Sequence, residues 1–319
     1  MKIKNLICGA VFVACATLSA NNVGAWDGTG HMLVAQIAHD RLNEKARARV
    51  DALAAQVGSN GVPYNAITVA CWADDIKSRG FPSPFQGQFR TWHYIDIGCS
   101  PSDPDVLGQH VALTTTNGDV ITALNFCVDV IKNKKPNDLV PNEAVALALI
   151  EHFVGDIHQP LHTTARYNPN PKPDDKYRDD AGGNGVSVAN LADTPWGMNL
   201  HTFWDEAYRR SYQDGQVRAT EPILNEATAV GSPEMKEWMK LLQSYAPVNP
   251  DTRFDPKKWA LESHQIACTQ VYGTLGEPYG ARDIKLSEKY VAAGQTTARR
   301  QLVLAGYRLA ALLNDLYGK

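Results

Sequence analysis

The sequence has no excess of positive charge. Its 319 residues include 31 lysines and arginines against 34 aspartates and glutamates, which gives a formal net charge of −3 at pH 7. A broad basic surface supplies much of the affinity of many nucleic-acid-binding proteins, because its cations displace the counterions of the phosphates. The charge balance argues against such a surface here. Any phosphate binding would have to be local, and metal ions could supply the positive charge for it.

Beyond residue 25 the chain also has no hydrophobic run long enough to span a membrane. Residues 1–25 are typical of a secretory signal peptide, with Lys2 and Lys4 before a short apolar run at Leu6–Ala16 and small residues up to Ala25 for cleavage. A buried N-terminal helix is the alternative. Cleavage would leave a chain that starts at Trp26 and carries a net charge of −5, since the leader holds two lysines and no acidic residue. We therefore expect a secreted or periplasmic protein without stable membrane insertion.

Paired C-x-x-C spacing, which is typical of structural zinc sites, is absent. Of the six cysteines, two lie in the predicted leader. The four that remain are Cys71, Cys99, Cys127 and Cys268. Four cysteines in an exported chain suggest two disulfides, and the residues alone leave all three pairings open.

Strand signals are sparse, and neither an internal repeat nor a clear linker is visible. Apolar residues recur instead at helical spacing, most regularly in Asp119–Ile131, Pro141–His158 and Ser287–Tyr317. Further helices are expected at His31–Leu42, Glu44–Val57, Asn65–Lys77, Leu200–Arg210, Ser232–Tyr245 and Pro256–Val271.

Two long segments with several prolines and glycines are expected to be loops. They are Phe81–Asp105, with a short extended piece at Thr91–Ile97, and Thr163–Trp196. Long loops inside a compact domain are often functional. The sequence thus predicts one all-α domain over residues 26–319, a compact multi-helix fold with long loops and few or no strands.

Two pairs of histidine and aspartate repeat the same spacing. His152 and Asp156, and likewise His201 and Asp205, stand four residues apart on predicted helices and so project from one face. His162 follows the end of the first of these helices and can turn back toward that face. One such pair is more often a surface ion pair. Two pairs within apolar sequence would bury their carboxylates, which is costly unless a cation such as zinc neutralises them.

Further candidate ligands lie nearer the N-terminus. Cleavage would expose the α-amine of Trp26, which has a pKa near ~8 and can bind a metal once it is deprotonated. His31 follows after two glycines, although this arrangement could be a coincidence. Asp74 and His93 are weaker candidates, because Asp74 could cap or pair and His93 could be a core residue. The remaining histidines without such companions are interpreted as ordinary: His39, His110 and His264.

Together these residues resemble the zinc-dependent single-strand-specific nucleases that fungi and plants secrete. The matching strings are His152-x-x-x-Asp156-x-His158-Gln159-Pro160-Leu161-His162 and Asn199-Leu200-His201-x-x-Trp204-Asp205, together with Trp26 and His31. The resemblance covers essentially the whole mature chain. Since that family shares a superfamily with the bacterial zinc-dependent phospholipases C, it implies an all-α fold of the phospholipase C/nuclease type.

The resemblance implies three Zn²⁺ per chain. The first ion would take Asp74, His93, His152 and Asp156; the second would take the amine and carbonyl of Trp26, with His31 and the shared Asp156; the third would take His162, His201 and Asp205. These sets leave positions open for water, as in catalytic sites, and zinc lowers the pKa of bound water toward ~7.

The implied activity is hydrolysis of single-stranded DNA and RNA to 5′-phosphate products. Activity on 3′-mononucleotides is compatible with the same cluster, and we expect a monomer. Members of the family usually carry an arginine where this chain has Lys77. Lys77 is expected to keep the positive charge that faces the phosphate, but its ammonium lacks the planar, bidentate geometry of a guanidinium. Asp96 is expected to orient this cation, while Asp156 bridges two of the ions.

Substrate recognition is assigned by the same resemblance. Tyr94 would stack on a base, and Gly183 and Asn184, in Gly182-Gly183-Asn184, would belong to a base pocket. Tyr94 could instead be a core residue and the glycine pair a turn. The resemblance also implies a disulfide between Cys99 and Cys268, which leaves Cys71 with Cys127.

Two other functions remain as alternatives. A zinc-dependent phospholipase C would use the same metal cage, but the Tyr94 and Gly182-Gly183-Asn184 matches favour a nuclease, as does the lack of an appended lipid-binding domain. A non-catalytic zinc-binding protein of the cell envelope would bind the metal without turnover. The open coordination positions argue against it.

Overall fold

A computed structural model describes residues 26–59, 62–78, 89–99, 118–168, 179–192, 198–276 and 279–319. The predicted leader, residues 1–25, lies outside the described residues, as do His110 and much of the two predicted loops.

Helices dominate the described part, as predicted. The α-helices are α1 (Gly28–His39), α2 (Glu44–Ala54), α3 (Trp72–Ser78), α4 (Val120–Asn133), α5 (Glu143–Asp156), α6 (Leu200–Glu206), α7 (Pro233–Leu242), α8 (Pro256–Ile266), α9 (Gly273–Leu275) and α10 (Glu288–Tyr317). Shorter 3-10 turns are η1 (Thr68–Cys71), η2 (Arg90–His93), η4 (Pro160–His162), η5 (Ala207–Arg209) and η6 (Gln243–Tyr245), and η7 (Ala267–Tyr272) is a π-helix.

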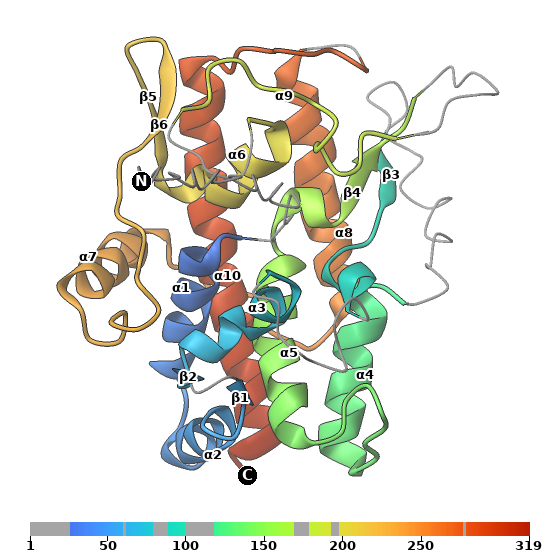
Figure 1. The fold of residues 1–319 in the computed structure, drawn as a ribbon, viewed down its shortest axis with the longest axis vertical. Helices are drawn as coiled ribbons and strands as arrows, with labels where there is room; N and C mark the ends of the chain where they lie inside the picture. Colours follow the sequence, from blue (N-terminus) through green and yellow to red (C-terminus); the bar gives the residue numbers. More distant parts are fainter. Residues whose placement is uncertain are drawn as a thin grey trace, which may run out of the picture.

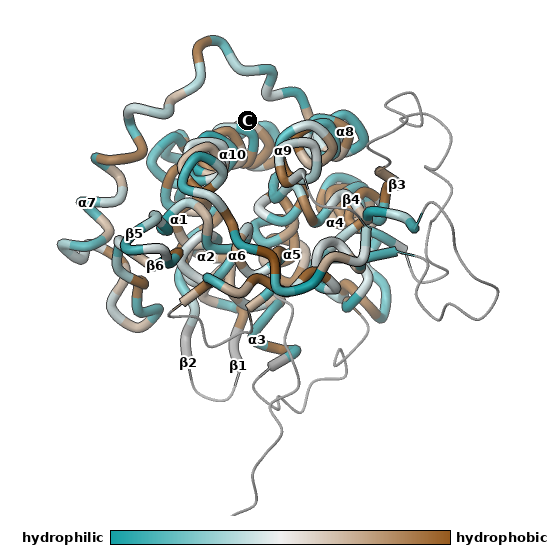
Figure 2. Tube along the Cα trace, turned by 90° about the horizontal axis from the view of Figure 1, so that it is seen from above, coloured by the Kyte–Doolittle hydropathy of each residue, from teal (hydrophilic) through white to brown (hydrophobic). Residues whose placement is uncertain are grey.

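The helix α5 forms the centre of the fold. It packs against α1, α4 and α10, and α10 runs the length of the molecule beside it (Figure 1). Viewed from above, α5 lies between these three helices (Figure 2). Every residue from Ala144 to Asp156 is buried, as expected of a helix that is apolar on nearly all sides. The polar residues that α5 carries are therefore buried with it.

Side-chain caps define where the helices that position the site begin. Asn142 accepts a hydrogen bond from the backbone N–H of Val145 and starts α5, while Asn199 accepts one from Thr202 and starts α6. Such caps satisfy backbone donors that have no partner within the helix. The start of α5 thus lies two residues after Pro141, the residue at which the sequence predicted it.

Strands are few, as predicted, and form three two-stranded sheets among the described residues. These are the antiparallel pair β1 (Gly58–Ser59) and β2 (Val62–Pro63), the parallel pair β3 (Ile97–Cys99) and β4 (Thr164–Arg166), and the antiparallel hairpin β5 (Arg210–Gln213) and β6 (Gln216–Ala219). The extended piece predicted at Thr91–Ile97 is wrong for its first half, because Arg90–His93 forms the turn η2.

The parallel pair joins two distant segments of the chain. Ile97 pairs with Thr164 and Cys99 with Arg166. The backbone N–H of Ile95 also donates to the carbonyl of His162 at 2.8 Å. The segment that follows His93 is thereby fixed beside the segment that follows His162.

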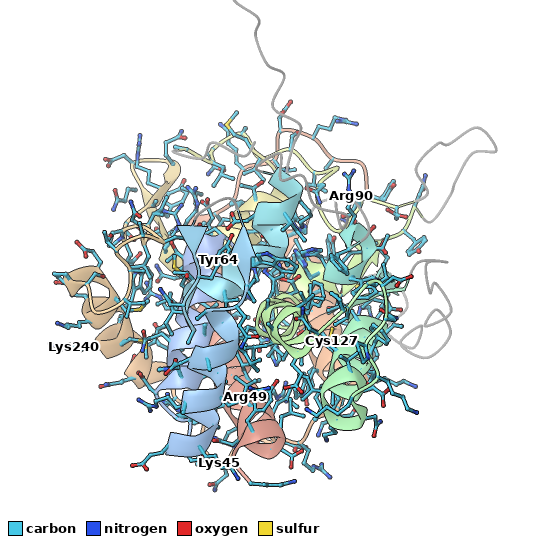
Figure 3. All side chains as sticks on the ribbon, turned by 60° about the horizontal axis from the view of Figure 1, so that its bottom comes forward. Lys45, Arg49, Tyr64, Arg90, Cys127 and Lys240 are labelled. Carbon is cyan, nitrogen blue, oxygen red and sulfur yellow. A yellow bond between two sulfur atoms is a disulfide. The ribbon has the colours of Figure 1, made fainter. Side chains whose placement is uncertain are left out.

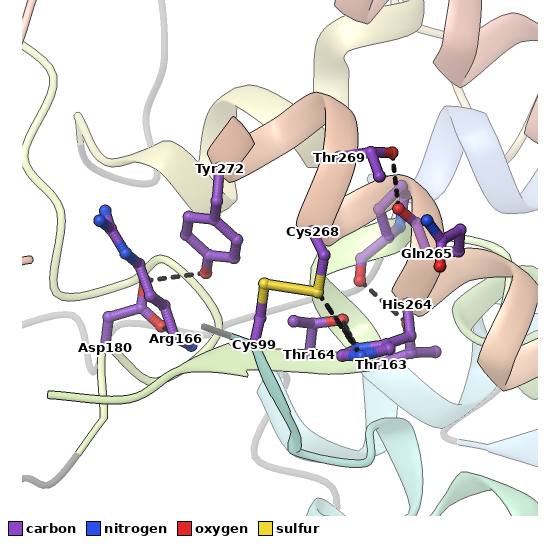
Figure 4. Close-up of a disulfide and its surroundings, with 11 residues drawn as sticks. Cys99, Thr163, Thr164, Arg166, Asp180, His264, Gln265, Cys268, Thr269 and Tyr272 are labelled. Carbon is purple, nitrogen blue, oxygen red and sulfur yellow. Dashed lines mark hydrogen bonds between the residues drawn. A yellow bond between two sulfur atoms is a disulfide. The ribbon is translucent and has the colours of Figure 1, made fainter. Parts of the chain in front are cut away.

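The described residues contain one disulfide. Cys99 in β3 is bonded to Cys268 in η7, next to His264 and Thr164 (Figure 4), which confirms the pairing implied by the family resemblance. The expected second bridge is wrong, because Cys71 and Cys127 are both free and buried.

The free cysteines belong to separate packing environments. Cys71 in η1 donates its thiol to the carbonyl of Gly28 at 3.5 Å. Cys127 lies among the helices on α4, whereas charged groups such as Lys45 and Lys240 lie on the outside (Figure 3). Burial raises the pKa of both thiols and keeps them protonated.

Over the described residues, no helix combines the length and the hydrophobicity needed to cross a bilayer. The buried hydrophobic residues instead form one continuous cluster from Trp26 to Tyr317.

Removing the disulfide is expected to destabilise the protein. The double substitution Cys99→Ser and Cys268→Ser should lower the free energy of unfolding by about 2–5 kcal/mol, because the bridge restricts the unfolded chain. Denaturant midpoints with and without reductant measure this effect. The double variant also serves as the control, because reductant should leave its denaturant midpoint unchanged. A wild-type midpoint that does not respond to reductant contradicts the prediction.

Candidate metal centre

The first cluster of polar side chains lies at the C-terminal end of α5. His152 and Asp156 project from one face of the helix, with His152 Nε2 at 3.4 Å from Asp156 Oδ2. His31 on α1 stacks on the ring of His152, with ring centroids 3.8 Å apart, and its Nε2 lies 3.4 Å from Asp156 Oδ1. All three side chains are buried. The predicted i, i+4 pair therefore points into the protein, where it meets a third candidate ligand.

The second cluster shares His152 with the first. His93, at the end of η2, brings Nδ1 to 3.0 Å from His152 Nε2 and to 2.9 Å from Asp156 Oδ2. Asp74 on α3 places Oδ1 at 3.7 Å from His152 Nε2 and at 3.8 Å from His93 Nδ1. The two oxygens of Asp156 thus face two different groups of ligands, as a bridging carboxylate does.

The third cluster joins η4 to α6. His162 and His201 bring their Nε2 atoms to 3.1 Å from each other, and Asp205 Oδ1 lies 3.6 Å from His201 Nε2 and 4.0 Å from His162 Nε2. In each of the three groups, one ligand atom per residue lies within 4.8 Å of the others. The structure therefore brings together all the side chains predicted as metal ligands.

Backbone carbonyls determine which imidazole nitrogens carry protons. Nδ1 of His152 donates to Ala70 O, Nδ1 of His162 donates to His93 O and Nδ1 of His201 donates to Gly182 O, each at 2.7 Å. A carbonyl only accepts, so in the neutral rings each Nε2 carries a lone pair. Metal-binding histidines are commonly oriented in this way.

The short distance between His162 and His201 fits a shared cation. Two Nε2 atoms that both carry lone pairs cannot hydrogen-bond to each other, yet they lie 3.1 Å apart. Two nitrogens bound to one tetrahedral zinc at ~2.0–2.1 Å would lie about 3.3 Å apart. The geometry of this pair is close to that of two ligands on one ion.

Buried polar atoms without hydrogen bonds support the same interpretation. Both ring nitrogens of His31 and Oδ1 of Asp156 are buried and make no hydrogen bond. Unsatisfied groups of this kind are costly and rare in native proteins. Nitrogen and oxygen donors suit zinc. The residues therefore fit a group of bound zinc ions.

Electrostatics keeps the imidazoles neutral. Burial lowers the pKa of His31 to about 3, and it lowers that of His93 and His152 to about 4. Neutral imidazole is the form that binds a metal. Burial also raises the pKa of Asp156 and of Asp205, because nothing in the protein compensates their charge fully. A bound cation would supply that compensation.

Trp26 lies beside the first cluster. Its side chain is buried, and its indole Nε1 donates to the carbonyl of Gly155 at 2.9 Å. Gly155 also packs closely against His31. A Cβ added to Gly155 would lie only 2.8 Å from His31 Nδ1. The start of the predicted mature chain is thus next to Asp156, where its α-amine was predicted to bind.

Lys77 lies in the second cluster beside Asp74, whereas the charges close to Asp96 are other carboxylates. Lys77 Nζ is 2.7 Å from Asp74 Oδ1. Burial raises the pKa of Asp74, but the Lys77 charge outweighs it and holds that pKa below its usual range. Asp96 instead faces Asp179 and Asp180, and burial with these like charges raises its pKa to about 7. Asp96 follows His93 by three residues, and β3 carries the chain away from α3.

Of the predicted substrate residues, Gly183 lies next to the third cluster, because a Cβ built on it would lie 3.4 Å from the backbone N of His201. Tyr94 is partly exposed and close to Asp96 and Arg90, so it is not a core residue. Gly183 is buried with a φ of 85°. Asn184 is partly exposed, and its side-chain amide donates to Ala181 O within the same turn. The glycine pair thus forms a turn, and that turn borders the candidate metal centre.

Several positioning groups were not foreseen. The carbonyls of Ala70 and Gly182 orient histidines, and no side chain signals such a role in the sequence. Gln159 donates to Asp205 Oδ1 at 2.6 Å, and its place inside the histidine-rich string could have indicated it. His158 from the same string lies apart from the clusters and contacts Arg308 at 2.9 Å.

Comparison with known proteins identifies relatives over nearly the whole chain. The family model described as S1/P1 Nuclease matches residues 26–318. Nuclease S1 of Aspergillus oryzae is 28% identical over 312 residues, which cover 95% of this chain and 96% of the relative. Endonuclease 2 of Arabidopsis thaliana is 25% identical over 315 residues, covering 94% and 93%. Nuclease P1 of Penicillium citrinum is 24% identical over 304 residues, covering 92% and 98%.

The substitution Gly182→Ala is expected to disturb the third cluster. Gly182 has a φ of 61°, and an added Cβ would lie 2.7 Å from the carbonyl oxygen of Leu161, so the carbonyl that holds His201 must move. We expect a loss of about 1–3 kcal/mol in unfolding free energy and weaker zinc binding. Denaturant unfolding and zinc titration measure these effects.

Gly215→Ala provides the matched control. Gly215 has a φ of 80° in the β5–β6 turn, with nothing within 4 Å of the added Cβ. It therefore tests backbone strain without a steric clash and away from the clusters. If both variants bind zinc as the wild type does, the Gly182 carbonyl does not position His201.

Proposed function

Because this chain belongs to the S1/P1 nuclease family, we propose that it is a zinc-dependent endonuclease. It hydrolyses phosphodiester bonds of single-stranded DNA and RNA, leaves 5′-phosphate products and also acts on 3′-mononucleotides. The observation that carries the proposal is the gathering of eight His and Asp side chains into three compact groups, two of which share His152, with both ring nitrogens of the buried His31 left without a hydrogen bond. The relatives, named as nucleases and endonucleases, support the reaction class.

Nine residues would hold three zinc ions. They are Trp26, His31, Asp74, His93, His152, Asp156, His162, His201 and Asp205. When bound, zinc supplies positive charge for the phosphate and lowers the pKa of water, so that a nucleophile is available at neutral pH.

The protein's own groups keep this cluster in place. Asp156 presents one oxygen to each of the first two groups, and the carbonyls behind His152, His162 and His201 keep each Nε2 free to bind. Gln159 fixes the carboxylate of Asp205. Because these supports belong to helices and turns packed in the core, the site is preorganised.

Lys77 adds a fixed positive charge. Its ammonium is held against Asp74 at 2.7 Å, and its side chain is only 16% exposed. An ammonium has three donors, so the contact with Asp74 leaves others for a phosphate oxygen. Lys77 thereby stabilises the charge that develops on the phosphate.

The preference for single strands follows from base stacking. Tyr94 is partly exposed next to the cluster, where its ring can stack on a base. A base within a duplex is stacked and paired, so it must first be extruded to reach such a position. An unpaired strand requires less energy for this step. Asn184 and Gly183 would border the same base.

Export completes the proposal. The leader is removed after Ala25, which gives Trp26 a free α-amine, and the protein acts as a monomer outside the cytoplasm. The disulfide between Cys99 and Cys268 is consistent with an oxidising compartment.

Metal content and substrate range test the function together. The mature chain should contain three zinc ions, and chelation should abolish cleavage of single-stranded DNA, of RNA and of a 3′-mononucleotide, with recovery on addition of zinc. Elemental analysis and product analysis measure both, with duplex DNA as the substrate control. Turnover only on phosphatidylcholine would identify a phospholipase C. Zinc without turnover on any substrate would identify a binding protein.

Lys77→Ala should lower kcat by about 10²-fold and change KM little, because the charge acts mainly in the transition state. Steady-state rates on single-stranded DNA measure both constants. Lys240→Ala on the outer helix α7 is the charge-matched control and should have no effect (Figure 3). An unchanged kcat for Lys77→Ala would rule out this role.

A further inference from the structure

Asp27, the second residue of the predicted mature chain, has more partners than a helix cap requires. Its Oδ1 accepts from the backbone N–H of Gly30 at 2.9 Å, which caps α1, and also from the hydroxyl of Tyr208. Its Oδ2 accepts from Arg209 Nε at 3.1 Å. The side chain of Asp27 is 13% exposed and that of Arg209 only 3%. A buried ion pair thus joins the N-terminal segment to η5.

The ion pair continues into a chain of alternating charges. Arg209 Nη2 lies 3.1 Å from Glu206 Oε1, and Glu206 Oε2 accepts from Arg210 Nε at 2.7 Å. Arg210 in turn donates to the carbonyl of Ala192 at 2.6 Å. Two cations and two anions balance within this chain, which is buried apart from Asp27. Removing the charge of Asp27 would leave the buried Arg209 with one anionic partner fewer, which is costly inside a protein.

The N-terminal backbone is held from the same side. The N–H of Asp27 points at the carbonyl of Asp205 at 3.4 Å, and its own carbonyl accepts from the N–H of His31 at 3.2 Å. Trp26 is fixed by its indole bond to Gly155 and by an edge-on contact with Tyr208 at 6.0 Å. The segment that carries the predicted α-amine ligand therefore contacts α1, α5 and α6 at once.

We propose that Asp27 is a positioning residue for zinc: its ion pair with Arg209 aligns the mature N-terminus with His31 and Asp156 and ties the third cluster to the first two. Asp27 does not contact the ion itself. It acts through Trp26 on one side and through the helix that carries His201 and Asp205 on the other. The proposal rests on the proposed zinc-dependent function.

A helix cap alone would not produce this effect. A cap stabilises α1 by satisfying backbone N–H groups, and Asn can replace Asp in that role with little loss. The contact with Arg209 requires a charge and has no part in capping. Asp27→Asn therefore separates the two roles, because it retains the acceptor for Gly30 and removes the charge that faces Arg209.

The experiment compares zinc binding by the mature chain beginning at Trp26 and by Asp27→Asn. We expect ~10–100-fold weaker binding of one of the three ions in the variant, as is typical when an outer partner of a metal ligand is lost. Titration against a zinc chelator measures each affinity. Anomalous scattering at the zinc edge assigns the weakened ion, expected at the group of Trp26, His31 and Asp156.

Asp119→Asn is the matched control. Asp119 caps α4 with the same contact, accepting from Thr122 N at 2.8 Å, and it is buried. Wild-type zinc affinities in Asp27→Asn would overturn the proposal. If Asp27→Asn does not fold, Arg209→Gln decides, because it removes the charge that faces Asp27 and leaves the Asp27 cap of α1 unchanged. Wild-type affinities in that variant would also overturn it.

The zinc content of the wild-type chain distinguishes an error in the proposed function from an error in the proposed role of Asp27. A wild-type chain that binds fewer than three zinc ions contradicts the proposed function itself. A wild-type chain with three ions and an Asp27→Asn variant with unchanged affinities contradict only the role of Asp27.

Discussion

The buried carboxylate of Asp156 is the constraint on which the site depends. It lies at the end of a helix that is apolar on nearly every side, and its Oδ1 makes no hydrogen bond. Leaving such a group uncompensated in the interior is expensive, and burial accordingly raises its pKa. The three neutral imidazoles around it offer lone pairs rather than charge. A multivalent cation would compensate the charge of Asp156 and accept the lone pairs of the imidazoles. The elements around α5 supply the remaining candidate ligands from distant parts of the chain.

Much of this arrangement could be predicted from the sequence. The helical periodicity of α4, α5 and α10 is strong because each helix has a large buried face, so the pattern predicts all three. The observed ends differ from the predicted ends by a few residues. The spacing of His152 and Asp156 determines that they share a face. The other candidate side chains that the family resemblance grouped also lie together in the structure, although His152 there joins His31 and Asp156 as well.

The errors concern contacts that depend on the tertiary structure. Lys77 contacts Asp74 rather than Asp96, because β3 pairs with β4 and turns Asp96 toward Asp179. Cys71 and Cys127 remain thiols because each is enclosed by its own helix packing, which cysteine counting does not detect. Carbonyl groups that orient histidines leave no trace in residue type, so those of Ala70 and Gly182 could be found only from coordinates.

The parallel pairing of β3 with β4 has a consequence for the order of folding. The helices consist of local contacts and can form early, whereas two three-residue strands far apart in the chain must find each other through loop closure. This pairing brings His93 beside His162, so the two groups that contain these histidines assemble only after this non-local contact exists. Under the proposed zinc dependence, these groups would bind metal late, and chains with intact helices but without the β3–β4 pairing would bind it weakly.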